Sequence, residues 1–265
     1  MRKILKIGTR ASALALWQAH EVKHQIEKHD PDLQADIVKI RTTGDKVLDK
    51  PLADIGSKAL FTREIEEALL DSRVDVAVHS LKDLPTQMPE GLILGPVLKR
   101  GPSGDVLISK NKVPLNSLPE GCTIATGSLR RKAQLLHHRP DLKTVDLRGN
   151  VETRLKKLES NDWAGIIMAE AGIRRLQLEH VITGRIPFSL MLPAVGQGAI
   201  GLEVRQGDEH VIALLQPLSD AETTAAVTAE RAFLRRLEGG CQVPIGAHGE
   251  VDGETLTLHG VIADL

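Results

Sequence analysis

Residues 122–138 read CTIATGSLRRKAQLLHH, in which a short apolar run is followed by small and hydroxyl residues and then by an amphipathic stretch. The apolar run Cys122–Thr126 predicts a strand, and Leu129–His138 predicts a helix. The alternation continues with a strand at Thr144–Leu147, a helix at Glu152–Ser160 and a strand at Gly165–Ala169. Such alternation is typical of an α/β fold with mostly parallel sheets.

The same pattern occupies the first part of the chain. The expected elements are a strand at Ile4–Gly8, a helix at 12–29 capped by Ser12, a strand at Ala35–Ile40, a helix at Phe61–Leu70 and a strand at Val74–His79. Beyond Asp220 the pattern changes. A helix at Ala221–Leu237 precedes strands at Ile245–Val251 and Leu256–Ile262, which Asp252-Gly253 joins as a hairpin, so this part predicts a small α+β unit.

Two Pro/Gly-rich breaks, Arg100–Gly104 and Pro193–Gly198, divide the chain. They predict a first α/β domain from residues 1–99 plus 198–217, a second from 100–197, and an α+β domain from 218–265. The polar, non-periodic stretch Thr42–Lys58 predicts a long mobile loop, and loops of this length often form lids.

Composition excludes several classes of protein. The 265 residues carry a formal charge of -1 and include two Trp, three Phe and no Tyr. A nucleic-acid binder needs a basic excess, and single-strand binders also need aromatic side chains for stacking. No stretch approaches the ~18 apolar residues of a membrane span. Two widely separated cysteines, Cys122 and Cys241, predict neither a disulfide framework nor a zinc site and indicate a cytoplasmic protein.

The near-neutral total conceals an uneven distribution of charge. Between Arg130 and Arg175, eleven Lys and Arg face six acids, a local charge of +5. From Gly207 to the end, three Arg face ten acids, a local charge of -7. A cationic middle segment predicts a local anionic partner.

Basic residues recur where expected strands end. The four segments are Gly8–Ser12, His79–Asp83, Ala125–Arg131 and Arg148–Asn150. In open α/β sheets, ligands bind beyond the carboxyl ends of the strands, where helix N-termini attract anions. Arginine is unfavourable there unless an anion is present, and its planar fork binds carboxylates with two hydrogen bonds. The alternative for any single segment is a solvated arginine beside an ordinary helix cap.

Two further side chains suggest chemistry. Asp83 directly follows Lys82, and a carboxylate among cations stays ionised, so it could stabilise a developing cation or move protons. The alternative is a helix N-cap. Cys241 lies in a turn between two glycines and Pro244, which makes its thiol accessible, whereas Cys122 in an apolar strand predicts a buried structural thiol.

Two patterns are interpreted as misleading, and no metal is predicted. Gly196–Gly201 matches G-x-G-x-x-G, but it precedes a strand-like run instead of opening a helix, so it does not predict a dinucleotide site. His20 and His24 share a helix face with no third ligand evident, which indicates a solvated surface.

Together, these segments resemble the porphobilinogen deaminase (hydroxymethylbilane synthase) family over nearly the whole chain. The matching stretches are 8–19 (GTRASALALWQA), 79–85 (HSLKDLP), 128–131 (SLRR), 147–150 (LRGN), 153–155 (TRL), 192–198 (LPAVGQG), 230–233 (ERAF) and 238–244 (EGGCQVP). The resemblance implies two type II periplasmic-binding-protein-like domains around a cleft, with a small α+β domain that carries the cysteine. It also implies a cytoplasmic monomer.

The resemblance further implies a transferase that deaminates four porphobilinogen molecules and joins them head to tail. The chain grows on a dipyrromethane cofactor attached to Cys241 by a thioether, and water then releases hydroxymethylbilane. By similarity, Asp83 is the catalytic residue near the pyrrole nitrogens, and Lys58 and Phe61 belong to the lid. The cofactor-binding residues would be Lys82, Asp83, Ser128, Arg130, Arg131 and Arg154. The substrate-binding residues would be Arg10, Ser12, Arg148, Arg154 and Arg175.

The sequence departs from the family pattern at several points. Gly127 stands where many relatives have serine, and Ser57 and Ala59 replace lid glycines. The turn at Arg100–Asp105 lacks the more acidic sequence common there. The chain stops at Leu265 where relatives usually continue, so we expect an incomplete third domain.

Two other functions fit parts of the pattern. One is a non-catalytic polycarboxylate-binding protein, and the other is an inactive truncated homologue. A binder would need the arginines but has no use for Asp83 or for a glycine-flanked Cys241. Those two residues favour the enzyme.

Overall fold

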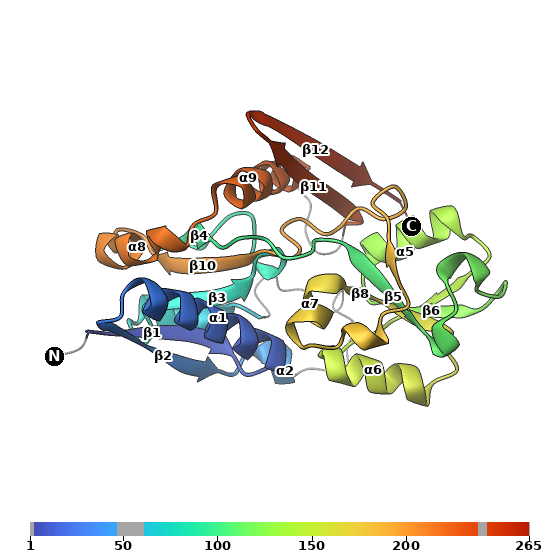
Figure 1. Ribbon diagram of the computed structural model, residues 1–265, viewed down its shortest axis with the longest axis horizontal. Coiled ribbons are helices and arrows are strands. Elements are labelled where there is room, and N and C mark those ends of the chain that lie inside the picture. The colour runs from blue at the N-terminus through green and yellow to red at the C-terminus, as the bar shows by residue number, and fades with distance from the viewer. Residues whose placement is uncertain (1–2, 47–60, 238–242, 265) are drawn as a thin grey trace.

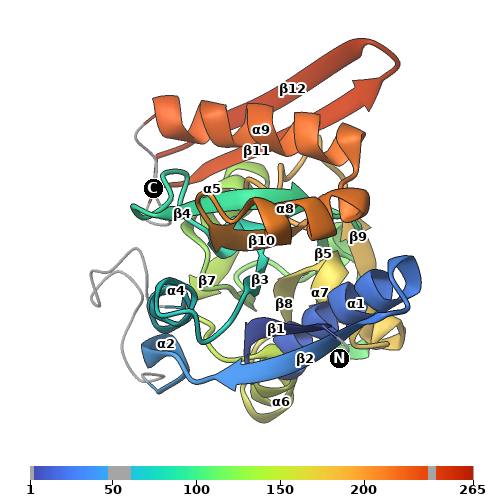
Figure 2. The same ribbon diagram turned by 90° about the vertical axis from the view of Figure 1, so that its left-hand side faces the viewer.

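A computed structural model describes residues 3–46, 61–237 and 243–264. Two five-stranded sheets lie side by side, and a helix with a β-hairpin lies at the top of the molecule in both views (Figures 1 and 2). The first sheet has the order β2-β1-β3-β10-β4. Its strands are β1 (Lys3–Arg10), β2 (Leu33–Ile40), β3 (Val76–Ser80), β4 (Leu92–Val97) and β10 (Ile200–Arg205).

The second sheet has the order β7-β6-β8-β5-β9. Its strands are β5 (Asp105–Ser109), β6 (Thr123–Ala125), β7 (Lys143–Val145), β8 (Gly165–Ala169) and β9 (Gly184–Ile186). The chain leaves the first sheet after β4 through residues 98–104, the outgoing crossing, and builds the second sheet. It then returns through residues 187–199, the returning crossing, to β10. In each sheet, three adjacent parallel strands therefore lie beside two strands that follow or precede a crossing.

The expectation of mostly parallel sheets is confirmed, because four of the five strands in each sheet run in the same direction. Strand β1 is parallel to β2 and β3, and β6 is parallel to β7 and β8, but β10 and β5 are antiparallel to both of their neighbours. Both exceptions are strands entered directly from a crossing between the sheets, without a helix to reverse the chain. The α/β class itself is confirmed.

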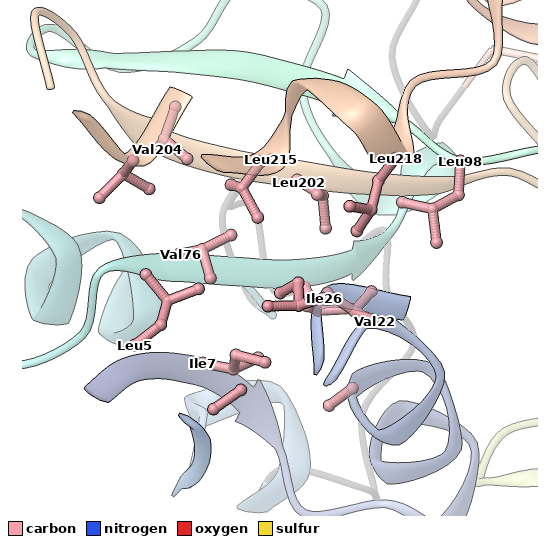
Figure 3. Packing of buried hydrophobic residues seen from close by; sticks show 14 of the residues in the cluster. Leu5, Ile7, Val22, Ile26, Val76, Leu98, Leu202, Val204, Leu215 and Leu218 are labelled. Carbon is pink, nitrogen blue, oxygen red and sulfur yellow. The ribbon is translucent and has the colours of Figure 1, made fainter. Parts of the chain in front are cut away.

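Side chains alternate across the first sheet because successive strand residues point to opposite faces. Val76 and Val78 of β3 join the cluster in Figure 3, where α1 (Ala13–His29) and α8 (Glu209–Leu215) cover one face. Ala77, between them, packs on the other face against α4 (Arg63–Leu70). Helices therefore cover both faces of the sheet and leave the strand ends for a site.

The second sheet follows the same rule. Val106 and Ile108 of β5 pack beneath α6 (Val151–Ser160) and α7 (Glu170–Arg175). Leu107, between them, packs on the opposite face with Leu135 of α5 (Leu129–His138). The expected bounds of α5 and β8 agree with those observed, and β6 and β7 are shorter than expected.

The third unit is α9 (Ala221–Arg236) packed against the hairpin of β11 (Ile245–Asp252) and β12 (Thr255–Ile262). The predicted Asp252-Gly253 turn is present, with Gly253 at φ 57°. Gly260 allows the close approach of helix and hairpin, since a Cβ there would lie 2.6 Å from Cζ of Phe233. The predicted small α+β unit is confirmed for the residues described.

The predicted loop at Thr42–Lys58 needs correction at its start. Thr43–Lys46 form a short helix, α2, whose first N–H donates to Oε1 of Glu64 at 2.7 Å. That carboxylate substitutes for the helical partner the N–H lacks. Residues 47–60, which include the predicted lid residue Lys58, lie outside the described part of the chain. Within that described part, no helix is long and apolar enough to cross a membrane.

A buried ion pair joins the third unit to the two crossings. Nη1 of Arg100 lies 2.6 Å from Oε1 of Glu230, and Nη2 lies 3.2 Å from Oε2. Glu230, on α9, is fully buried and also accepts the backbone N–H of Gly196 at 2.7 Å and of Gly249 at 2.8 Å. One carboxylate thus binds the outgoing crossing, the returning crossing and the hairpin.

We predict that Glu230→Gln lowers the free energy of unfolding by about 3–5 kcal/mol, because it leaves the buried Arg100 without its counter-charge. Urea unfolding of the purified chain measures this. Glu67→Gln is the matched control, since Glu67 pairs with Arg63 at the surface and its loss should cost about 0–1 kcal/mol. Equal losses in the two variants would contradict the assignment.

Candidate functional site

Basic side chains from both sheets interact electrostatically beside the crossings. Lys82, two residues after the end of β3, interacts with Asp83, Arg131, Asp105 and Arg154. Arg154, on α6, interacts with Arg131, Asp83 and Arg148. The structure therefore brings together residues that lie far apart in the sequence. We call Lys82, Arg130, Arg131, Arg148 and Arg154, with Asp83 and Asp105, the cationic cluster.

The turn after β3 presents Lys82 and Asp83. It is a single 3-10 turn, η1 (Leu81–Asp83), anchored by the buried Leu81. Ser80, just before it, accepts a hydrogen bond from Nε2 of the buried Gln18 at 2.8 Å. Asp83 ends η1 and is exposed, so the helix N-cap considered for it is not observed.

Arg130 and Arg131 lie in the first turn of α5, which Ser128 caps by accepting the N–H of Arg131 at 3.5 Å. Both arginines are buried against Asp105, the first residue of β5. Nη1 of Arg130 donates to Oδ2 at 2.9 Å, and Nη2 of Arg131 donates to Oδ1 at 2.8 Å. Their remaining contacts include the carbonyl oxygens of Leu192 and Ile167.

Arg148 and Arg154 flank the start of α6. Asn150 caps that helix through the N–H of Thr153 at 2.8 Å, and Nε of Arg154 donates to the carbonyl of Gly149 at 2.8 Å. Burial lowers the pKa of Arg154 to about 10, with Arg131 and Arg148 adding to the effect and Asp83 opposing it. The guanidinium stays charged at neutral pH, but at a cost that a bound anion would reduce.

Lys82 is the lysine of the cluster, and burial perturbs its charge as well. Burial lowers its pKa from 10.5 to about 8, Asp83 and Asp105 oppose that shift, and Arg131 and Arg154 add to it. Its Nζ approaches Oε1 of Gln197 at 3.5 Å, a long contact for a lysine. Lys82 is thus a desolvated cation among other cations.

The other predicted substrate residues lie around the same strand ends and the crossings. Arg10 ends β1 with its guanidinium carbon 4.4 Å from the centre of the Phe61 ring. Ser12 caps α1 by accepting the N–H of Ala15 at 3.4 Å. Arg175 donates to the carbonyl of Gly198 at 2.6 Å and lies 5.5 Å from the Trp17 ring. Burial lowers the pKa of Arg175 to about 10.

The two cysteines differ in what the structure describes. Cys241 lies within residues 238–242, outside the described ranges, so its predicted role has no geometry here. Cys122 directly precedes β6, is half-buried, and packs at the edge of the second core. Burial raises the pKa of its thiol. This environment disfavours the reactive thiolate at Cys122.

Gly127, one of the departures from the family pattern, is required by its surroundings. A Cβ at this position would lie 2.7 Å from the carbonyl oxygen of Leu147. That contact is with backbone, so a serine would force the turn between β6 and α5 away from the segment that carries Arg148.

Two residues of the site were missed in the sequence. Asp105 precedes the apolar run Val106–Ile108 of β5, and an acid at a buried strand position is a signal that could have been noticed. Gln197 lies inside the G-x-G-x-x-G pattern, which does precede β10 as expected. Its amide contacts both Asp105 and Lys82.

The cluster has the chemistry of a site for a polycarboxylate. Five cations face two acids, so three positive charges have no counter-charge within it. Among the described residues, Nε of Arg130, Nε of Arg131 and Nη1 of Arg148 are buried and have no hydrogen-bond partner. Buried charged donors without partners are costly, and ligand carboxylates would satisfy them. The same ranges contain no group of three His, Cys, Asp or Glu residues that could hold a metal.

Comparison with known proteins agrees with this chemistry. Residues 5–213 match the family described as porphobilinogen deaminase, dipyromethane cofactor binding domain, and residues 224–265 match its C-terminal domain. The chain belongs to the porphobilinogen deaminase family. The family, the transferase class and the dipyrromethane cofactor predicted from sequence are confirmed.

Individual relatives are similar over nearly the whole length of this chain. The chain is 54% identical over 265 residues to porphobilinogen deaminase of Desulforamulus reducens, covering 100% of this chain and 86% of the relative. It is 53% identical over 261 residues to that of Syntrophotalea carbinolica, covering 98% and 83%. Among solved structures, the periplasmic VFT2 domain of Bordetella pertussis BvgS gives a TM-score of 0.49 at 12% identity, covering 88% of this chain and 93% of that one.

We predict that the ligand-free chain becomes more stable as the pH rises above about 8, because Lys82 loses its buried charge. Its folded pKa of about 8 lies below the unfolded value of 10.5, so burying the charged form destabilises the fold below pH 8. That destabilisation is lost as the pH rises from about 8 toward 10.5. The free energy of unfolding of the wild type, relative to Lys82→Met, should therefore rise between pH 7.5 and pH 10.

Urea unfolding at the two pH values measures the difference. Lys39→Met, at an exposed lysine on β2, controls for the loss of a charge. Identical pH dependence in wild type and Lys82→Met would contradict the prediction.

Proposed function

We propose that this chain acts as a hydroxymethylbilane synthase. It deaminates four porphobilinogen molecules, joins them head to tail on a covalent dipyrromethane primer, and releases the linear tetrapyrrole by hydrolysis. The observation that carries this proposal is the cationic cluster, which has an exposed carboxylate, Asp83, beside three uncompensated positive charges in a member of this family.

Cations from both sheet units would bind the cofactor. Lys82, Ser128, Arg130, Arg131 and Arg154 would hold its acetate and propionate groups, and the Cys241 thiol would form the thioether. The unpaired Nε atoms of Arg130 and Arg131 support this assignment, because they are charged donors without acceptors. When bound, the dipyrromethane would supply the terminal pyrrole carbon to which the first incoming ring is joined, and each later ring would be joined to the ring added before it.

Binding of porphobilinogen falls to Arg10, Ser12, Arg148, Arg154 and Arg175. Planar guanidinium groups suit the two carboxylates of the substrate, since one guanidinium can donate two parallel hydrogen bonds to one carboxylate. The buried, unpaired Nη1 of Arg148 supports its place in this set. Ser12 would contribute while its hydroxyl remains the cap of α1.

Asp83 would stabilise the positive charge that develops on the substrate and would accept a proton from it. Loss of ammonia from porphobilinogen leaves an electrophilic ring that bears positive charge, and a fixed carboxylate stabilises such charge where water is excluded. The same carboxylate can accept the proton lost when the new carbon–carbon bond restores the aromatic ring.

The remaining assignments concern closure and context. Phe61, beneath the guanidinium of Arg10, and Lys58 would close over the substrate as part of a lid. The domain limits 1–99 plus 198–217, 100–197 and 218–265 stay predictions, as do the monomeric state and the cytoplasmic location.

An intact-mass measurement tests the proposed function. After expression in cells that make porphobilinogen, or after incubation with it, the wild type should gain the mass of two linked pyrroles. Cys241→Ser should gain nothing, and Cys122→Ser should load like the wild type. Folded wild type without an adduct would contradict the enzyme and favour the polycarboxylate-binding alternative. An adduct on Cys122 would contradict the assignment of Cys241 as the attachment residue.

A second prediction concerns Asp83. Asp83→Asn should retain the adduct on Cys241 but lose about a hundredfold or more of turnover, because it removes a proton carrier and a stabilising charge together. Steady-state rates on protein whose loading is verified by mass measure the effect. Turnover close to that of the wild type would remove Asp83 from its role.

A further inference from the structure

Asp105 is a fully buried carboxylate with three charged or polar neighbours on its two oxygens. Oδ2 accepts Nη1 of Arg130 at 2.9 Å. Oδ1 accepts Nη2 of Arg131 at 2.8 Å and Nε2 of Gln197 at 2.9 Å. Nothing in the proposed chemistry uses Asp105 directly. It nevertheless fixes the terminal nitrogens of both arginines.

Gln197 extends this arrangement to the first sheet. Its Nε2 donates to Asp105 and also to the carbonyl oxygens of Ser103 at 2.7 Å and Gly104 at 3.2 Å. An amide nitrogen among three acceptors fixes which way the amide points, and Oε1 is left to face Nζ of Lys82 at 3.5 Å. The outgoing and returning crossings therefore meet at one side chain.

The charge balance explains why a carboxylate stands here. Two guanidinium groups are buried side by side, and without a counter-charge their burial would be prohibitive. Burial alone would raise the pKa of Asp105, but Arg130 and Arg131 outweigh it and hold that pKa well below its usual range. Asp105 is thus ionised and compensates one of two charges. The other charge stays available to an anion.

We propose that Asp105 is the positioning residue of the cofactor-binding cations, holding Arg130 and Arg131 directly and Lys82 through Gln197 before the ligand arrives. This inference rests on the proposed function of those three cations. A preset arrangement lowers the cost of binding, because the long arginine and lysine side chains do not have to be ordered by the ligand.

Two effects of removing Asp105 oppose each other, and their balance makes the proposal testable. Asp105→Asn raises the positive charge of the site, which by simple electrostatics would speed the loading of an anionic cofactor. It also releases the arginines from their fixed positions. If positioning dominates, loading slows in spite of the added positive charge.

The test uses the full chain, freed of cofactor and incubated with porphobilinogen. The adduct on Cys241 is followed by intact mass, and the KM of the loaded fraction is measured separately. We expect Asp105→Asn to load cofactor at least about tenfold more slowly, because small displacements of binding groups cost about this much in rate. The KM for porphobilinogen should change by less than about twofold. Asp105→Glu, which keeps the charge, should recover part of the rate.

Glu170→Gln is the matched control. Glu170 is also a buried acid of the second sheet unit that pairs with two arginines, Arg174 and Arg185, both through Nε at 2.7 Å. Neither arginine belongs to the cationic cluster, so this variant should load like the wild type. Thermal unfolding of each variant separates loss of folding from loss of positioning.

Gln197→Met keeps the proposal testable if Asp105→Asn fails to fold. It removes the amide link without changing charge, and loading should slow by about threefold to tenfold, the value of a lost hydrogen bond. Loading of Asp105→Asn or Gln197→Met at the wild-type rate or faster would overturn the proposal. Failure of the wild type itself to load would instead overturn the proposed function.

Discussion

The ion pair between Arg100 and Glu230 is the constraint on which the rest of the structure depends. Glu230 is fully buried, and it receives the guanidinium of Arg100 together with two backbone N–H groups, from the returning crossing and from the hairpin. Arg100 in turn donates from Nε to the carbonyl of Gln197 at 2.8 Å. Because the chain crosses between its two sheets twice, this contact sets how the crossings lie against each other and against α9.

The crossings are also where the site begins. Gly101 donates its N–H to the carbonyl of Gly198 at 3.1 Å, and a Cβ on Gly198 would lie 2.7 Å from the carbonyl oxygen of Gly101. Gln197 lies within this close approach and contacts Asp105 on one side and Lys82 on the other. The arrangement that holds the units together therefore also orients cations that come from both sheets.

The electrostatics of the site follow from concentrating like charges in a chain of nearly zero net charge. The cationic cluster retains unsatisfied buried donors, and burial lowers the pKa of Lys82 to about 8 and that of Arg154 to about 10. Folding tolerates this because stabilisation elsewhere, in the apolar clusters of both sheets, compensates for it. A ligand with several carboxylates would reduce this electrostatic cost by pairing with the unsatisfied donors.

Local predictions from the sequence succeeded where one strand or helix decides the outcome. Period-two and helical patterns placed α5, β8 and α9 within a residue of their bounds. Hydroxyl and amide side chains at Ser12, Ser128 and Asn150 do cap helices, so the ordinary explanation for them holds beside the functional one. The reversed direction of β5 and β10 was not predicted, because the sequence does not show that these two strands are entered from a crossing rather than from a helix.

The sequence by itself determined the family, the α/β class and the basic residues that follow the strands, because these depend on local pattern and on motifs of neighbouring residues. Only the tertiary structure decided which of those residues meet. Asp105, Gln197 and Lys82 lie on separate segments, and their contacts exist because two crossings pack together. The charge environment of Lys82 was also decided there, since a pKa depends on burial and on neighbours that only folding supplies.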